Sequence, residues 1–114
     1  MDKFRVLVTG GRFYGNADRV FEVLDEYNPD EVLQGGCPTG ADLAARDWAR
    51  WRERTCITVY AKWHTHNIAA GPVRNQQMLD EYCPDCVVAF PGGRGTQDMI
   101  HRAQAVGLDV AIVS

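Results

Sequence analysis

Short apolar runs alternate with longer amphipathic stretches along this chain, and this alternation limits the fold more than any other feature. The runs are β-branched and nearly continuous in hydrophobicity, which is typical of parallel strands buried on both faces. We predict strands at Phe4–Thr9, Glu31–Leu33, Ile57–Ala61, Asp85–Phe90 and Asp109–Val113. We predict helices at Asn16–Tyr27, Thr39–Arg54, Gly71–Tyr82 and Thr96–Val106, with an irregular loop from Lys62 to Ala70. The pattern indicates an α/β, Rossmann-like doubly wound sheet of about five parallel strands, with helices on both faces.

The size and charge of the chain limit how many domains it can form and which partners it can bind. Its 114 residues fit a single domain over residues 1–114. No apolar run approaches the roughly 20 residues that span a bilayer, so we expect no membrane partner. A net charge of −3 gives no basic field for nucleic acid. Without a secretion signal, the four cysteines are expected to be free thiols, which favours a cytoplasmic protein.

Glycine-rich turns follow several of the predicted strands. Pro91-Gly92-Gly93-Arg94-Gly95-Thr96 lies between an apolar run and a helix start, Gly10-Gly11-Arg12 follows the first strand, and Gly35-Gly36 follows the second. A strand, a glycine turn and a helix start in sequence direct backbone N–H groups at one point, which suits a phosphate or another anion. A single turn of this kind is more often only a turn.

The strand order decides whether these turns meet. In the order 3-2-1-4-5, strands 1 and 4 are neighbours at the switch point, where doubly wound sheets bind ligands. The loop after strand 2 and the segment Gly71–Asn75 are expected to reach the same edge. The predicted ligand-binding residues are Gly10, Gly11, Arg12, Gly35, Gly36, Thr39, Gly40, Asp42, Arg74, Asn75, Pro91, Gly92, Gly93, Arg94, Gly95 and Thr96.

Each predicted residue type has a physical role. The arginines offer planar forks for phosphate or carboxylate. Thr96 is expected to donate its hydroxyl to an anion while capping its helix, and Thr39 to cap the second helix with Asp42 three residues on. Asp42 either holds a ribose hydroxyl or a base amino group, or serves only that cap.

Other signals are weaker. Cys83-Pro84-Asp85-Cys86 with His64 and His66 has the donors for zinc, but Cys86 begins a buried strand and no second C-x-x-C exists, so we expect no metal and no cofactor. Trp63 either stacks on a base or covers an apolar edge. Trp48 and Trp51 fit core packing or a dimer interface.

The four motifs Gly10-Gly11-Arg12, Gly40-Ala41-Asp42, Gly71–Asn75 and Pro91–Thr96 together resemble the SLOG superfamily, specifically its small YspA-like branch. The resemblance covers nearly the whole chain, with the motifs in the right order. It implies a Rossmann-like fold and a nucleotide-derived ligand, and the branch is frequent in bacteria and phages. Related members are the LOG-type phosphoribohydrolases, formerly called lysine decarboxylase-like, the DprA-like proteins, and sensor domains of antiphage systems.

The phosphoribohydrolases carry a proline-glycine-glycine-x-glycine-threonine-x-x-glutamate motif. This chain matches its first six positions but has Met99 in place of the glutamate, and a thioether cannot take a proton. The family's catalytic arginine most nearly matches Arg74, and Asp98 or Asp42 are candidate substitutes for the carboxylate. We therefore expect a ligand-binding module, a sensor or sequestering domain that forms a homo-oligomer. The alternatives are a phosphoribohydrolase that cleaves the N-glycosidic bond of nucleoside monophosphates, and a scaffold for protein interactions.

Overall fold

The computed structural model describes residues 3–114. The strands are β1 (Arg5–Thr9), β2 (Glu31–Gln34), β3 (Thr55–Thr58), β4 (Cys86–Ala89) and β5 (Val110–Ile112). The helices are α1 (Ala17–Tyr27), α2 (Gly40–Trp51), α3 (Trp63–His66), α4 (Ala70–Tyr82) and α5 (Arg94–Ala105), with a 3₁₀ turn, η1 (Asn67–Ala69), between α3 and α4.

The strands form one all-parallel sheet in the order β3-β2-β1-β4-β5, which confirms the predicted α/β doubly wound fold. β1 lies at the centre, where Leu7 is in register with Leu33 of β2 and with Val87 of β4. Because β2 and β4 lie on opposite sides of β1, the helical connections on the two sides cover opposite faces of the sheet, and the switch point lies at the carboxyl ends of β1 and β4.

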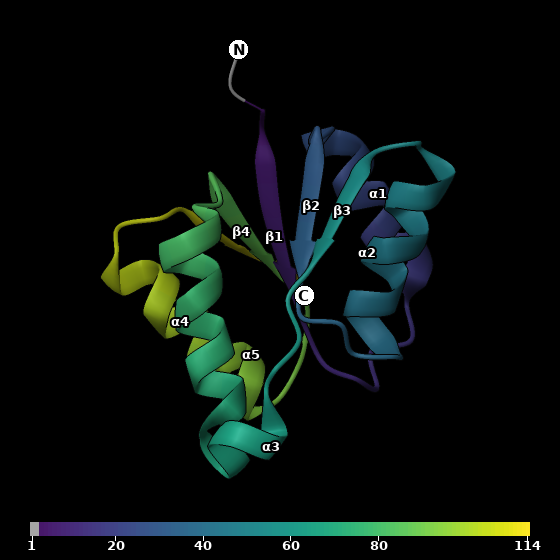
Figure 1. Ribbon diagram of the computed structural model, residues 1–114. Helices are drawn as coiled ribbons and strands as arrows, with labels where there is room; N and C mark the ends of the chain where they lie inside the picture. Colours follow the sequence, from purple (N-terminus) through teal and green to yellow (C-terminus); the bar gives the residue numbers. More distant parts are fainter. Residues whose placement is uncertain (1–2) are drawn as a thin grey trace.

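The helices cover the sheet in two layers, α1 and α2 on one face and α4 and α5 on the other (Figure 1). Alternate side chains of β1 serve the two layers, since Val6 and Val8 pack beneath α1 and α2, while Leu7 packs beneath α4 and α5. Both faces of the central strands are therefore buried, which explains their continuous hydrophobicity.

Two boundaries differ from the predictions. β3 runs from Thr55 to Thr58 rather than Ile57–Ala61, because its four residues pair one-to-one with the four residues of β2 and the chain has no partner strand beyond Gln34. The loop predicted to be irregular from Lys62 to Ala70 contains α3 and η1, two elements too short to leave a periodic signal in the sequence.

The remaining elements lie close to their predicted positions. Asn16 caps α1, because its side-chain oxygen accepts the N–H of Arg19 at 3.0 Å. Gly107, at φ +82°, follows the last residue of α5 and its cap. Within residues 3–114, none of the helices is long and apolar enough to span a bilayer.

Candidate functional site

The loops after β1 and β4 touch through their backbones at the edge of the sheet. The N–H of Gly11 donates to the carbonyl of Pro91 at 2.9 Å. A Cβ on Gly11 would lie 3.0 Å from Cα of Gly92, and a Cβ on Gly92 would lie 2.6 Å from the nitrogen of Gly11. Side chains at either position would drive the loops apart, so this close approach requires glycine.

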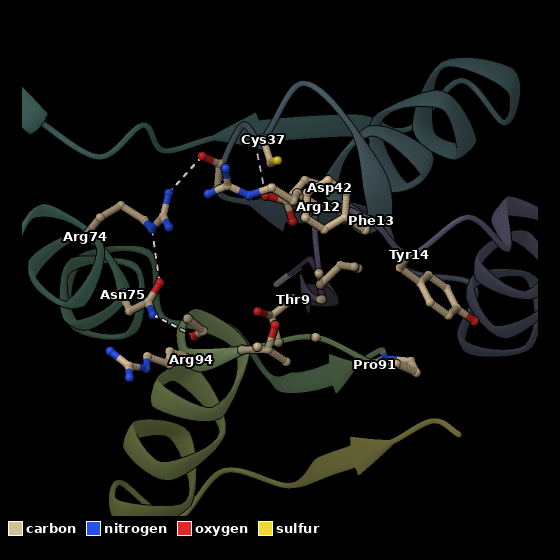
Figure 2. A pocket seen from close by; sticks show the side chains of 18 of the residues that line it. Thr9, Arg12, Phe13, Tyr14, Cys37, Asp42, Arg74, Asn75, Pro91 and Arg94 are labelled. Atoms are coloured by element: carbon tan, nitrogen blue, oxygen red, sulfur yellow. Dashed lines mark hydrogen bonds between the residues drawn. The ribbon is translucent and has the colours of Figure 1, made fainter. Parts of the chain in front are cut away.

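A cavity of about 710 Å³ opens over this contact (Figure 2). Its volume lies within the range of about 300–1,000 Å³ that is usual for small-molecule sites. Thirteen predicted ligand-binding residues line it: Gly10, Gly11, Arg12, Gly35, Asp42, Arg74, Asn75, Pro91, Gly92, Gly93, Arg94, Gly95 and Thr96. The structure therefore brings four distant segments of the chain to one hollow.

Arg74 of α4 is held at the wall of the cavity by backbone carbonyls. Its Nη1 donates to the carbonyl of Gly35 at 2.8 Å and to that of Val59 at 3.3 Å, and its Nε donates to Oδ1 of Asn75 at 3.0 Å. Burial lowers the pKa of the guanidinium, and the nearby Asp42 carboxylate opposes this shift. An arginine stays charged despite such a shift, so Arg74 supplies a cation in a fixed position. Its Nη2 takes part in none of these three bonds.

Asp42 lies in the first turn of α2 and lines the same cavity as Arg74 (Figure 2). Its Oδ2 accepts the backbone N–H of Cys37 at 3.1 Å. Burial raises the pKa of the carboxyl, and the N–H of Cys37 and the charges of Arg74 and Arg46 only partly offset it. Among the described residues that line the cavity, Asp42 is the one carboxylic acid.

The loop between β2 and α2, which leads to Asp42, is held by the side chains of Arg46 and Gln34. Arg46 donates from Nη1 to Oε1 of Gln34 at 2.9 Å and from Nη2 to the carbonyl of Cys37 at 2.7 Å. The same Oε1 accepts the N–H of Gly36 at 2.7 Å. The loop after β2 is therefore built around a buried glutamine.

The first turn of α5 forms the floor of the site. Gly93 is its N-cap residue and makes no side-chain cap, so the prediction that Thr96 caps this helix is wrong. Thr96 is instead buried inside the first turn with its Oγ1 beside Gly92. The N–H groups of an uncapped first turn have no partner within the helix, and they suit an anion. Arg12 and Arg94 are exposed at the rim.

Three predicted ligand-binding residues do not line this cavity. Gly36 and Thr39 line a smaller neighbouring cavity, and Gly40, at φ +71°, packs against Arg12, where a Cβ would lie 2.7 Å from its carbonyl carbon. Thr39 is the N-cap residue of α2, as predicted, but its side chain makes no cap bond, because its hydroxyl donates to the carbonyl of Arg12 at 2.7 Å. Thr39 and Gly40 therefore hold the loop after β1 against the start of α2.

Residues 4–66 match the family model YAcAr, described as the YspA, cpYpsA-related SLOG family. The chain belongs to this family. Among curated proteins, none matches the chain significantly. The match confirms the resemblance to the YspA-like branch of SLOG, and membership points to a nucleotide-related ligand or activity. The matched part includes Gly10–Arg12 and Asp42, whereas Arg74 and the turn from Pro91 to Thr96 lie beyond it.

In this YspA-related SLOG protein, the position of the phosphoribohydrolase glutamate faces the core. Met99 has 0% exposed surface and packs among the apolar side chains between the sheet and α4. The neighbouring Asp98 does not line the cavity. Its Oδ2 accepts Nδ2 of Asn75 at 3.0 Å and Nε of Arg102 at 2.8 Å. Although burial opposes the shift, these hydrogen bonds lower the pKa of Asp98. Asp98 thus ties α4 to α5 and supports Asn75.

Several lining residues escaped the sequence analysis. They are Val8, Thr9, Phe13, Tyr14, Cys37 and Met78. Phe13 and Tyr14 directly follow Gly10-Gly11-Arg12, and Met78 lies one helical turn beyond Asn75, so adjacency to a predicted residue was the available signal. Gln34 directly precedes the predicted Gly35, but Arg46 carried no such signal, because its role depends on contacts across the loop.

The cysteine and histidine side chains have the donor atoms for zinc, so their arrangement bears on a metal site. All four cysteines are free, with Cys83 exposed and Cys86 half-buried at the start of β4. Across residues 3–114, no group of three or more His, Cys, Asp or Glu side chains is arranged to hold a metal ion.

Proposed function

We propose that this protein binds a nucleotide or a nucleotide-derived small molecule in the 710 Å³ cavity and does not turn it over. The observation that carries the proposal is the lining itself, in which the glycine-rich first turn of α5 faces Arg74 across one hollow. Backbone N–H groups and a fixed guanidinium are the groups that bind phosphate in proteins. Family membership supports a nucleotide-related ligand.

Binding without turnover is supported by the lack of a free carboxylate at the position of the phosphoribohydrolase glutamate. Met99 occupies the glutamate position and is buried in the core, and Asp98 is engaged by Asn75 and Arg102. We therefore propose that the protein acts as a ligand sensor or sequestering module, as a homo-oligomer in the cytoplasm of a bacterial or phage-infected cell, with a role in antiphage signalling. The free cysteines support a reducing compartment.

The test is to incubate the protein with a panel of nucleoside mono-, di- and triphosphates and cyclic nucleotides. We expect at least one to raise the melting temperature, by mass action on the folded state, and to be recovered unchanged after denaturation. Arg74→Ala should abolish the shift, whereas Arg50→Ala, an exposed arginine on the far part of α2, should leave it intact. Failure of every nucleotide to stabilise the protein would refute the proposal.

A second candidate function, hydrolysis of the N-glycosidic bond of a nucleoside monophosphate, rests on Asp42. This carboxyl lines the cavity beside Arg74, and its pKa is raised by burial, which is the environment of a general acid. Free base released by the wild-type protein, and lost in Asp42→Asn, would favour the enzyme over the binding module.

A further inference from the structure

A second cavity, of about 390 Å³, opens beside the first. The two have part of their lining in common: Arg12, Gly35, Cys37, Asp42 and Arg74. Because both cavities are lined by these residues, they adjoin, and one ligand can extend from the glycine floor past Asp42 and Arg74 into the smaller cavity. The smaller cavity is also lined by the aromatic rings of Tyr60 and Trp63, which do not line the larger cavity.

Both aromatic side chains of the smaller cavity are largely exposed. Tyr60 is 66% exposed and Trp63 is 58% exposed, although both line the cavity. The ring of Tyr60 lies against Gly36, where a Cβ would come within 2.6 Å of its Cδ1, and the tip of the Trp63 ring, Cη2, lies 3.8 Å from a Cβ built on Gly71. Each ring therefore has a glycine beside it and leaves much of its own surface open. Flat, open aromatic surface is the part of a protein on which nucleobases stack.

We propose that the smaller cavity binds the base of a nucleoside 5′-phosphate by stacking on Trp63 and Tyr60, while the phosphate occupies the first turn of α5. This inference rests on the proposed function and adds the orientation of the ligand. Asp42 then lies between the two ends, where its carboxylate can accept hydroxyl hydrogens of the ribose. The aromatic wall comes from the segment after β3, which joins the site only because β3 is the strand next to β2.

Phe13 is the competing aromatic surface. It lines the larger cavity and is 93% exposed. It stands on the loop after β1 beside the rim, however, and it does not line the smaller cavity. A base on Phe13 would leave the smaller cavity empty, so the two arrangements predict different mutational effects.

The experiment compares ligands with and without a base. Isothermal titration calorimetry measures the affinity of the four ribonucleoside 5′-monophosphates and of ribose 5-phosphate for the wild-type protein. The variants are Trp63→Ala and Tyr60→Ala, with Phe13→Ala for the competing surface. Trp51→Ala is the matched control, because Trp51 is 73% exposed and lines neither cavity.

We expect the best nucleotide to bind at least about tenfold more tightly than ribose 5-phosphate, the gain that stacking of one base supplies. Trp63→Ala and Tyr60→Ala should remove most of that gain and leave the affinity for ribose 5-phosphate unchanged. The nucleotide, but not ribose 5-phosphate, should quench tryptophan fluorescence in Trp51→Ala, and this quenching should be absent in Trp63→Ala. Since the replaced rings are exposed, all variants should keep the wild-type melting temperature.

Three results would overturn the proposal. Equal affinity for nucleotides and ribose 5-phosphate would show that no base site exists, while leaving the phosphate site intact. Loss of nucleotide affinity in Phe13→Ala, with none in Trp63→Ala and Tyr60→Ala, would place the base on the other side of the cavity. Absence of binding of either ligand to the wild-type protein would refute the proposed function, and this inference with it.

Discussion

Gly11 and Pro91, eighty residues apart in the chain, are joined by a backbone hydrogen bond of 2.9 Å from the N–H of Gly11 to the carbonyl of Pro91. This bond crosses the switch point of the sheet and sets the two glycine loops against each other. The cavity exists because the loops meet there without side chains between them. Substitutions at this contact should therefore affect both stability and binding.

Gly92→Ala should damage the site, and Gly93→Ala should not. A Cβ on Gly92 would collide with Oγ1 of Thr96 and would lie 2.6 Å from the nitrogen of Gly11, whereas a Cβ on Gly93 meets nothing within 4 Å. We expect Gly92→Ala to lose about 1–3 kcal/mol of unfolding free energy, the usual cost of overpacking, and Gly93→Ala to stay close to wild type. Urea denaturation measures both. Equal stability of the two variants would show that the loops can separate at no cost.

Arg74→Lys should weaken nucleotide binding by about tenfold or more, although the charge is kept. A lysine cannot reproduce the fork that donates to Gly35, Val59 and Asn75 at once, so the cation loses its fixed position. Arg50→Lys is the matched control, because Arg50 is exposed on α2 and lines neither cavity. Calorimetric titration tests this prediction, and equal affinities for the two variants would contradict it.

Met99→Glu should not restore a catalytic carboxylate. The side chain is completely buried among apolar residues that include Leu7 and Met78, so an ionised glutamate there has no partner. We expect a loss of roughly 3 kcal/mol or more of unfolding free energy, against less than about 1.5 kcal/mol for the volume-conserving Met99→Leu. The measurement is chemical denaturation, with release of free base as a second readout. A stable, active Met99→Glu variant would show that this position faces the ligand.

Asp42→Asn should raise stability near neutral pH, and its advantage should shrink as the pH falls. Burial raises the pKa of Asp42 above its ordinary value of 3.8, so in the pH window between 3.8 and the folded-state pKa the folded protein binds more protons than the unfolded chain. The wild-type protein therefore loses the full free energy of burying the Asp42 charge above the folded-state pKa, and none of it at a pH well below 3.8.

Melting temperatures of wild type and Asp42→Asn, compared between pH 4 and pH 8, measure this difference. The comparison cancels the opposite contribution of Asp98, whose lowered pKa stabilises the protein until the pH falls through it. A difference that does not change with pH, or that grows on acidification, would show that Asp42 does not carry the cost of a buried charge.

The order of elements and the switch point were predictable because they depend on local patterns. Apolar runs such as Val6–Val8 must be buried on both faces, and the right-handed crossover rule then leaves few strand orders. The glycine turns that follow such strands were visible for the same reason. That they bind a nucleotide stays a prediction.

The sequence by itself therefore determined the doubly wound sheet and the meeting of Gly10–Arg12 with Pro91–Thr96. Only the tertiary structure decided which polar groups face the cavity. Asp98 and Met99 are neighbours in the chain, yet one joins Asn75 and Arg102 between two helices and the other lies in the core. Thr39 looked like a side-chain cap, but its hydroxyl donates to the carbonyl of Arg12, a contact between loops 27 residues apart that no local pattern predicts.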